Sequence, residues 1–142
     1  MRLFNSEFEV SMRVLLLLDT FNSSLDLDQI MYLDFFTIFS KNYGLEGENI
    51  NGDSDYRINS LTMQPDLYKN AIRELVTSGF IVVRSEQDGF RYRINESGRK
   101  LCKSMTSDYS IQYKNNATLT RMRFIEASIE SIKTFAKQKE GK

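Results

Sequence analysis

The sequence has 142 residues, with 19 Lys or Arg, 19 Asp or Glu, one Cys and neither His nor Trp. The length fits one domain with a sizeable core, and a hydrophobic fraction of 41% is that of an ordered globular protein. The absence of His excludes Ser-His-Asp and Cys-His nucleophiles and the His ligands of most zinc sites. A single Cys forms no internal disulfide, so a reducing, cytoplasmic setting is expected.

The net charge of zero hides two halves of opposite charge. Residues 1–71 carry five basic and eleven acidic groups, a net charge of −6, and residues 72–142 carry 14 basic and 8 acidic groups, a net charge of +6. The asymmetry fits either different partners at the two ends of the chain or an uneven scatter of surface charge. The longest purely apolar run, Val14–Leu18, is far short of the roughly 20 residues of a membrane span, so no membrane partner is expected.

The first two helices are predicted from caps and apolar runs. Ser6 and Glu9 have the spacing of a capping box and predict a helix over about residues 7–19. Asp26 or Asp28 can cap a second helix that runs to about residue 41. Its segment IMYLDFFTIF is apolar on nearly every side, so the helix is central to the core or covered by something else. We therefore expect some of its aromatic side chains to contact a partner or the C-terminal helix. The candidates are Tyr32, Phe35 and Phe39.

A long acidic loop is predicted over residues 43–60, which contain three Gly and several Asn. Its acids could bind a hard cation, but their spacing does not match an EF-hand and no further ligand completes a site. We interpret them as solvated loop residues: Glu46, Glu48, Asp53 and Asp55. There is also no phosphate-binding Gly motif, so the sequence predicts no catalytic residue, no cofactor and no metal.

A helix, a hairpin and a further helix are predicted next. Pro65 opens a helix that ends at Gly79, and strands over residues 80–84 and 90–94 flank an Asp-Gly turn. On the second strand apolar residues alternate with arginines, which predicts one buried face (Phe90, Tyr92, Ile94) and one cationic face (Arg91, Arg93). Asn95 can cap the helix that follows.

A last helix is predicted from about Thr118 to Lys137. Five apolar residues recur along it at 3-4-3-4 spacing as a short coiled-coil-like seam: Met122, Ile125, Ile129, Ile132 and Ala136. The seam can pack back on the domain or against its own copy in a dimer, and we expect intermolecular contact here.

The order helix–helix–loop–helix–hairpin–helix is that of a winged helix-turn-helix, most specifically over residues 68–101. The predicted fold is mainly α with a β-hairpin: a winged-helix domain (residues 1–97) with a C-terminal helical extension (98–142). In winged helices that bind DNA, the helix before the wing enters the major groove and the wing touches phosphates. The candidate DNA contacts are Lys69, Asn70, Arg73, Arg84, Arg91 and Arg93. Three acidic residues interleave with this patch and weaken it: Glu74, Glu86 and Asp88. The alternative interpretation is that the basic residues are the solvated faces of a helix and a hairpin.

Four segments together resemble one family. They are Phe4–Phe21 (FNSEFEVSMRVLLLLDTF), Leu25–Phe35 (LDLDQIMYLDF), ELVTSGFI and GFRYR in the wing region. The sequence resembles the small middle component of ABC-three-component systems over roughly residues 3–105. It departs from that pattern in the long loop, where the family tends to be rich in Pro and His and this chain is acidic and rich in Asn.

The resemblance implies a function that composition and spacing do not. Such proteins are encoded beside a large SMC- or Rad50-like ATPase and an effector, often a nuclease, in sets similar to the Lamassu type of antiphage defence. The middle component would be a non-enzymatic adaptor on the ATPase heads that helps hold the effector inactive until foreign DNA is sensed. Weak contact with the DNA backbone through the wing is compatible with this role.

Two other functions stay open at this point. Residues 68–101 also fit a dimeric winged-helix transcriptional regulator, which would bind one operator tightly and with strong salt dependence. A small enzyme is a third possibility, and its activity would be lost when the acids of the loop are mutated.

Overall fold

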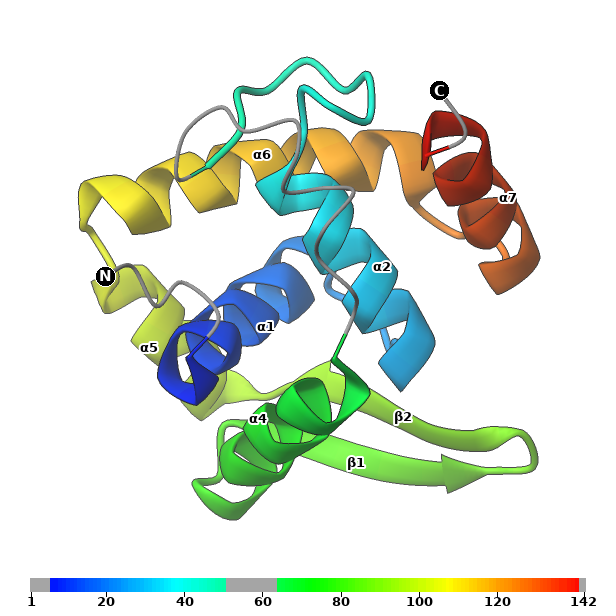
Figure 1. Ribbon diagram of the computed structural model, residues 1–142. Coiled ribbons are helices and arrows are strands. Elements are labelled where there is room, and N and C mark those ends of the chain that lie inside the picture. The colour runs from blue at the N-terminus through cyan, green and yellow to red at the C-terminus, as the bar shows by residue number, and fades with distance from the viewer. Residues whose placement is uncertain (1–5, 51–63, 141–142) are drawn as a thin grey trace.

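The computed structural model describes residues 6–50 and 64–140. The elements run α1 (Glu7–Phe21), α2 (Leu27–Ile38), α4 (Pro65–Thr77), β1 (Ile81–Glu86), β2 (Gly89–Ile94), α5 (Glu96–Ser104), α6 (Asp108–Phe124) and α7 (Ile129–Glu140) (Figure 1). The two strands form one antiparallel hairpin within this part of the chain. The predicted class, mainly α with a β-hairpin, is confirmed.

Helix boundaries follow from capping residues that the sequence reveals. The side chains of Ser6, Asp26 and Asn95 each accept a hydrogen bond from the backbone N–H three residues on, at 3.3, 2.8 and 2.9 Å. Pro65 is the first residue of α4, where its missing N–H costs nothing. Gly79 follows this helix with φ of 82°, the left-handed conformation that ends many helices. Residues close in sequence therefore determine where α1, α2, α4 and α5 begin.

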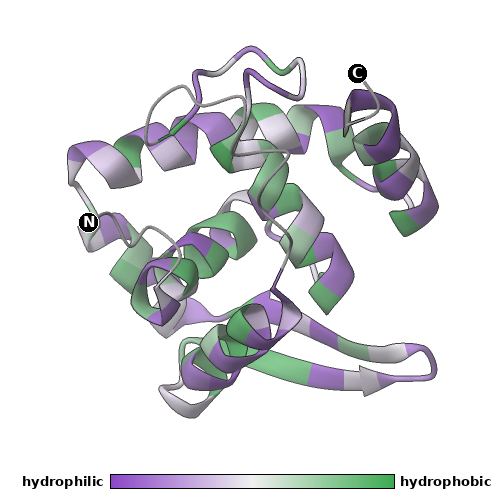
Figure 2. Cartoon of the chain, in the orientation of Figure 1, coloured by the Kyte–Doolittle hydropathy of each residue, from purple (hydrophilic) through white to green (hydrophobic). Residues whose placement is uncertain are grey.

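The core lies around α1 and α2, which are crossed by α6 (Figure 1). Hydrophobic residues recur along α1 and α2, as the colouring in Figure 2 shows. One cluster of buried side chains includes members from every described helix and from the base of the hairpin. Residues predicted as a C-terminal extension belong to this same cluster: Cys102, Tyr113, Ala117, Phe124, Ile132 and Phe135.

A buried ion pair lies at the centre of the helices. Arg13 on α1 and Asp34 on α2 are both fully buried, and two guanidinium nitrogens of Arg13 lie 3.1 Å from the two carboxylate oxygens of Asp34. The hydroxyls of Tyr68 on α4 and Tyr113 on α6 each donate a hydrogen bond to Asp34 at 2.6 Å. One carboxylate thus joins four helices, and its charge is fully compensated by hydrogen bonds.

The continuous helix predicted from Thr118 to Lys137 is wrong. The chain leaves the helical conformation at Ile125, and Glu126 adopts a positive φ of 64°. The side chain of Ser128 then accepts a hydrogen bond from the N–H of Ser131 at 3.1 Å, which caps the start of α7. Because α7 folds back, the five predicted seam residues do not form one stripe.

Aromatic packing explains why the chain turns back. Phe135 on α7 packs against Phe36 of α2 and Phe124 of α6, with ring centroids 5.2 and 4.9 Å away. The ring of Tyr43 is tilted against Phe36 at 4.7 Å and lies 6.3 Å from Phe135, and the guanidinium of Arg123 lies 5.0 Å from the ring centre of Phe135. A straight helix would leave Phe135 in water, so the turn buries apolar surface at the cost of one helical turn.

The start of the predicted loop is fixed on α2 and α6. The N–H of Gly47 donates to Ser40 at 3.1 Å, and the side-chain amide of Asn116 donates to the carbonyls of Thr37 and Glu48 at 3.1 and 2.7 Å. A Cβ on Gly47 would overlap the side chains of Asn116 and Ser40, so a larger residue here would displace the two side chains that hold this segment. Residues 51–60 of the predicted loop lie outside the described residues.

Candidate interaction site: the groove between α4 and the hairpin

A short backbone pairing joins β2 of the hairpin to the segment between α1 and α2. Leu25, between α1 and α2, exchanges both backbone hydrogen bonds with Tyr92 of β2, at 3.0 and 2.8 Å. Tyr92 in turn lies opposite Val83 of β1 in the hairpin register. This pairing fixes the orientation of the hairpin beside α2 and α4.

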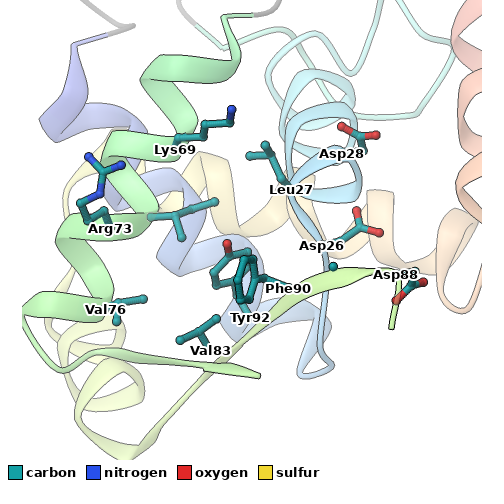
Figure 3. A pocket seen from close by; sticks show the side chains of 12 residues that line it. Asp26, Leu27, Asp28, Lys69, Arg73, Val76, Val83, Asp88, Phe90 and Tyr92 are labelled. Atoms are coloured by element: carbon teal, nitrogen blue, oxygen red, sulfur yellow. The ribbon is translucent and has the colours of Figure 1, made fainter. Parts of the chain in front are cut away.

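A groove opens between α4, the start of α2 and one face of the hairpin (Figure 3). Its volume is about 640 Å³. Half of the residues that line it are apolar or aromatic: Leu27, Ile72, Val76, Val83, Phe90 and Tyr92. In this view Val83, Phe90 and Tyr92 lie between α4 on one side and α2 on the other. The site is therefore a surface groove with an apolar floor.

The predicted buried face of the second strand is only partly formed. Ile94 is buried, but Phe90 is 57% exposed and Val83 on the neighbouring strand is 44% exposed. The physical reason is the length of the hairpin, whose tip extends beyond the helices, so that the far half of its apolar face has no described element over it (Figure 1). Val82 on the opposite face is also exposed.

The two sides of the groove carry opposite charges. Lys69 and Arg73 line the groove from α4, whereas Asp26 and Asp28 line it from the start of α2 and Asp88 from the hairpin tip. Asp28 also pairs with Lys133 of α7 at 3.7 Å, at the surface. The groove thus has one basic rim, one acidic rim and an apolar floor between them.

The structure separates the six candidate DNA contacts into two groups. On the hairpin, Arg91 pairs with Glu86 at 3.1 Å and with Asp88 at 3.5 Å, and Arg84 lies 3.7 Å from the same Glu86. Two of the three predicted wing arginines are therefore already neutralised by neighbours in the hairpin. Arg93 is exposed, and no carboxylate of the described residues lies within ion-pair distance of it.

On α4, the three predicted contacts share the exposed side of the helix. Lys69, Asn70 and Arg73 are all exposed, and Arg73 donates a hydrogen bond to the side chain of Asn70 at 3.1 Å. Lys69 and Arg73 face the groove, so the basic rim and the predicted DNA contacts are in part the same residues.

The candidate partner residues differ in how far they are buried. Phe35, Phe39 and Ile132 are buried in the core, and Tyr32 and Ile129 are half-buried. The all-round apolar character of α2 is thus satisfied within the chain, because α7 covers the side of α2 that α1 and α6 leave open. Met122 and Ile125 remain exposed, at 71% and 42%. A partner contact through these two stays a prediction.

The structure describes two of the four acids of the predicted loop. Glu46 and Glu48 are exposed, and Asp53 and Asp55 lie outside the described residues. No group of three or more His, Cys, Asp or Glu side chains within residues 6–50 and 64–140 is arranged to hold a metal ion. In the same residues no helix combines the length and apolar character needed to cross a membrane.

Sequence reasoning missed the apolar floor of the groove. Val83 and Val76 were not predicted as site residues, although a signal was present: the strand reads IVV, with two adjacent valines instead of alternation. In a two-stranded hairpin, such a run must leave apolar side chains on both faces.

Comparison with known proteins identifies the family. The family model described as "ABC-three component (ABC-3C) system Middle Component 2" matches residues 3–142. No curated protein and no solved structure matches the chain significantly. The match extends over the helices, the hairpin and the groove, and the chain belongs to the middle component 2 family of ABC-three-component systems.

Proposed function

We propose that this chain is a non-catalytic adaptor subunit that bridges an SMC- or Rad50-like ATPase and a nuclease-type effector in an antiphage or anti-plasmid defence complex of the Lamassu type. Membership of the middle component family supports the general role, because a middle component functions within a set of proteins. The groove is the observation that carries the proposal, since an apolar floor between charged rims is typical of a surface that binds protein.

We further propose that the fold is a winged helix. The chain order α1, the Leu25 pairing, α2, α4 and the hairpin supports this assignment, with α4 in the place of the recognition helix and the hairpin as the wing. In this proposal Arg93 supplies a weak contact with the DNA backbone, because it is an exposed cation without an ion pair among the described residues.

The adaptor function is tested by co-expression with the ATPase and effector encoded beside this chain. A tag on the chain is expected to recover both proteins in one complex that survives gel filtration. The proposal is contradicted if the chain elutes as a stable homodimer and recovers neither neighbour.

A dimeric transcriptional regulator is the second candidate. The exposed Lys69, Asn70 and Arg73 on α4 favour it, because Asn and Arg can read base edges in the major groove. It requires a dimer and one preferred operator, with binding at least about a thousandfold tighter than to unrelated DNA. Weak binding that is the same for all sequences would reject it.

A further inference from the structure

We propose that the groove between α4 and the hairpin binds an amphipathic helix of a partner protein. The helix would carry acidic residues along its edge facing α4 and basic residues along its edge facing α2 and the hairpin tip. The inference rests on the proposed adaptor function, in that the helix belongs to the ATPase or effector subunit.

The floor of the groove requires an apolar occupant. Phe90 and Val83 are 57% and 44% exposed, and they lie beside half-buried Leu27, Val76 and Tyr92. Side chains of this size gathered on one concave surface are unfavourable in water and typical of a protein-binding site. Figure 3 shows Phe90 and Tyr92 directed toward the space between α4 and α2. A row of apolar side chains on the occupant would cover them.

The walls of the groove favour a helix over an extended strand. The backbone groups of α4 and α2 are used within those helices, and the hairpin presents the side chains of one face to the groove. An extended peptide lying along this face would leave its own N–H and C=O groups without partners. A helix satisfies its backbone internally and offers apolar side chains at every third or fourth position.

The charges of the rims define the polarity of the occupant and argue against nucleic acid. Lys69 and Arg73 attract acidic groups. Across the groove Asp26 repels them, and Asp28 and Asp88 repel them more weakly because they are already paired with Lys133 and Arg91. DNA and RNA are negative along their whole length, so a duplex seated in the groove would meet three carboxylates. A helix with opposite charges on its two edges complements both rims at once.

Site-specific cross-linking in the co-expressed assembly tests the inference. A photoreactive benzophenone derivative of phenylalanine is placed at position 90, in the groove, and at position 122 as the control. Met122 is a large apolar residue, 71% exposed, on α6 and away from the groove. Position 90 is expected to cross-link to one segment of the ATPase or effector with apolar residues at helical spacing, and position 122 is expected not to reach that segment.

Charge reversal tests the predicted polarity. Arg73→Glu is expected to weaken capture of the cross-linked subunit about tenfold, and reversing an acidic residue on the captured segment is expected to restore it. Lys100→Glu, an exposed cation on α5, is the matched control and is expected to change nothing. Circular dichroism confirms that each variant is folded.

The outcomes separate this inference from the adaptor function. If the unmodified chain captures neither neighbour, the proposed function fails and the inference fails with it. If the assembly forms but position 90 cross-links to no subunit, to DNA, or to the same segment as position 122, the groove inference alone is overturned. Unchanged capture by both Arg73→Glu and Val83→Glu also overturns it, because these changes alter the basic rim and the apolar floor.

Discussion

Asp34 on α2 and Arg13 on α1 form an ion pair from which solvent is fully excluded, with guanidinium and carboxylate joined through two 3.1 Å hydrogen bonds. Burial lowers the pKa of Arg13, but the charge and hydrogen bond of Asp34, together with Tyr68 and Tyr109, outweigh burial and hold that pKa well above its ordinary value. Hydrogen bonds from Tyr68 and Tyr113 complete the surroundings of Asp34. The pair therefore fixes how α1, α2, α4 and α6 meet.

Replacing Asp34 by Ala is expected to lower the free energy of unfolding by about 3–5 kcal/mol, because it leaves the guanidinium of Arg13 buried without a counter-charge. Asp28→Ala is the matched control on the same helix. Asp28 is exposed and pairs with Lys133 at the surface, so its loss should cost less than about 1 kcal/mol. Urea denaturation measures both values. Equal costs for the two variants would show that the buried pair does not organise the core.

Alkaline pH is expected to destabilise the fold through the two tyrosines of this cluster. Burial, and then the charge of Asp34, raises the pKa of Tyr68 and of Tyr113 well above the ordinary value of 10.0. The folded state thus holds these protons more tightly than the unfolded chain. Their contribution to stability is complete below pH 10 and is lost as the pH rises above it.

The double variant Tyr68→Phe with Tyr113→Phe isolates this effect. The variant is less stable at neutral pH, because each lost hydrogen bond to a charged group costs about 1.5–3 kcal/mol. Its stability should nevertheless fall less steeply between about pH 10 and 11.5 than that of the unmodified chain. Burial also raises the pKa of Cys102, to about 12. The loss of stability with rising pH that remains in the double variant is therefore assigned to this thiol and to other groups. Identical slopes in urea titrations of the two proteins would exclude the tyrosines as the cause.

The attachment of α7 depends on Phe135. Phe135→Ala removes a ring that packs on Phe36 and Phe124, and should cost about 3–5 kcal/mol and increase hydrogen exchange throughout α7. Met122→Ala, at an exposed apolar position on α6, should change stability by less than about 0.5 kcal/mol. If α7 keeps its protection in the Phe135 variant, aromatic packing is not what holds it.

The wing arginines are expected to differ in their effect on DNA binding. Arg91 is already paired with Glu86 and Asp88, whereas Arg93 has no ion pair among the described residues. Arg93→Ala should therefore weaken binding to any duplex and reduce the salt slope by about one, and Arg91→Ala should have a smaller effect. Fluorescence anisotropy with two unrelated duplexes over a range of salt measures both. A larger effect of Arg91→Ala than of Arg93→Ala would contradict this prediction and would place the DNA contact at Arg91.

The sequence predicts those features of the fold that depend on local chemistry. The caps at Ser6, Asp26 and Asn95, the proline start of α4 and the hairpin are present in the structure. The two-residue turn of the hairpin lies at residues 87–88, one position before the predicted Asp-Gly pair, and Gly89 begins β2 opposite Glu86. Each of these features needs only residues within a few positions of one another, so a single sequence is sufficient to recognise it.

Long-range contacts account for what the sequence did not predict. The spacing of Ile125, Ile129 and Ile132 fits one helix, but the contact of Phe135 with Phe36, 99 positions earlier in the chain, makes the chain turn at Glu126. Helix propensity is a weak preference that tertiary packing overrides. A visible sign was Ser128 followed by Ser131, a pattern that can cap a new helix.

The candidate site was predicted only at its rims. Lys69 and Arg73 were recognised because charged residues on a predicted recognition helix stand out, whereas Phe90 was expected to be covered and no prediction was made for Val83. Alternation along a strand shows which residues share a face, but not whether another element packs over that face. That depends on the length of the hairpin relative to the helices beneath it.

The mass of the native assembly tests the central claim most directly. The chain is co-expressed with its proposed ATPase and effector partners, purified through a tag on the ATPase, and the assembly is weighed by native mass spectrometry. The adaptor account predicts one species that contains all three proteins, and loss of the effector when this chain is omitted. A complex of ATPase and effector that forms equally well without this chain would contradict it.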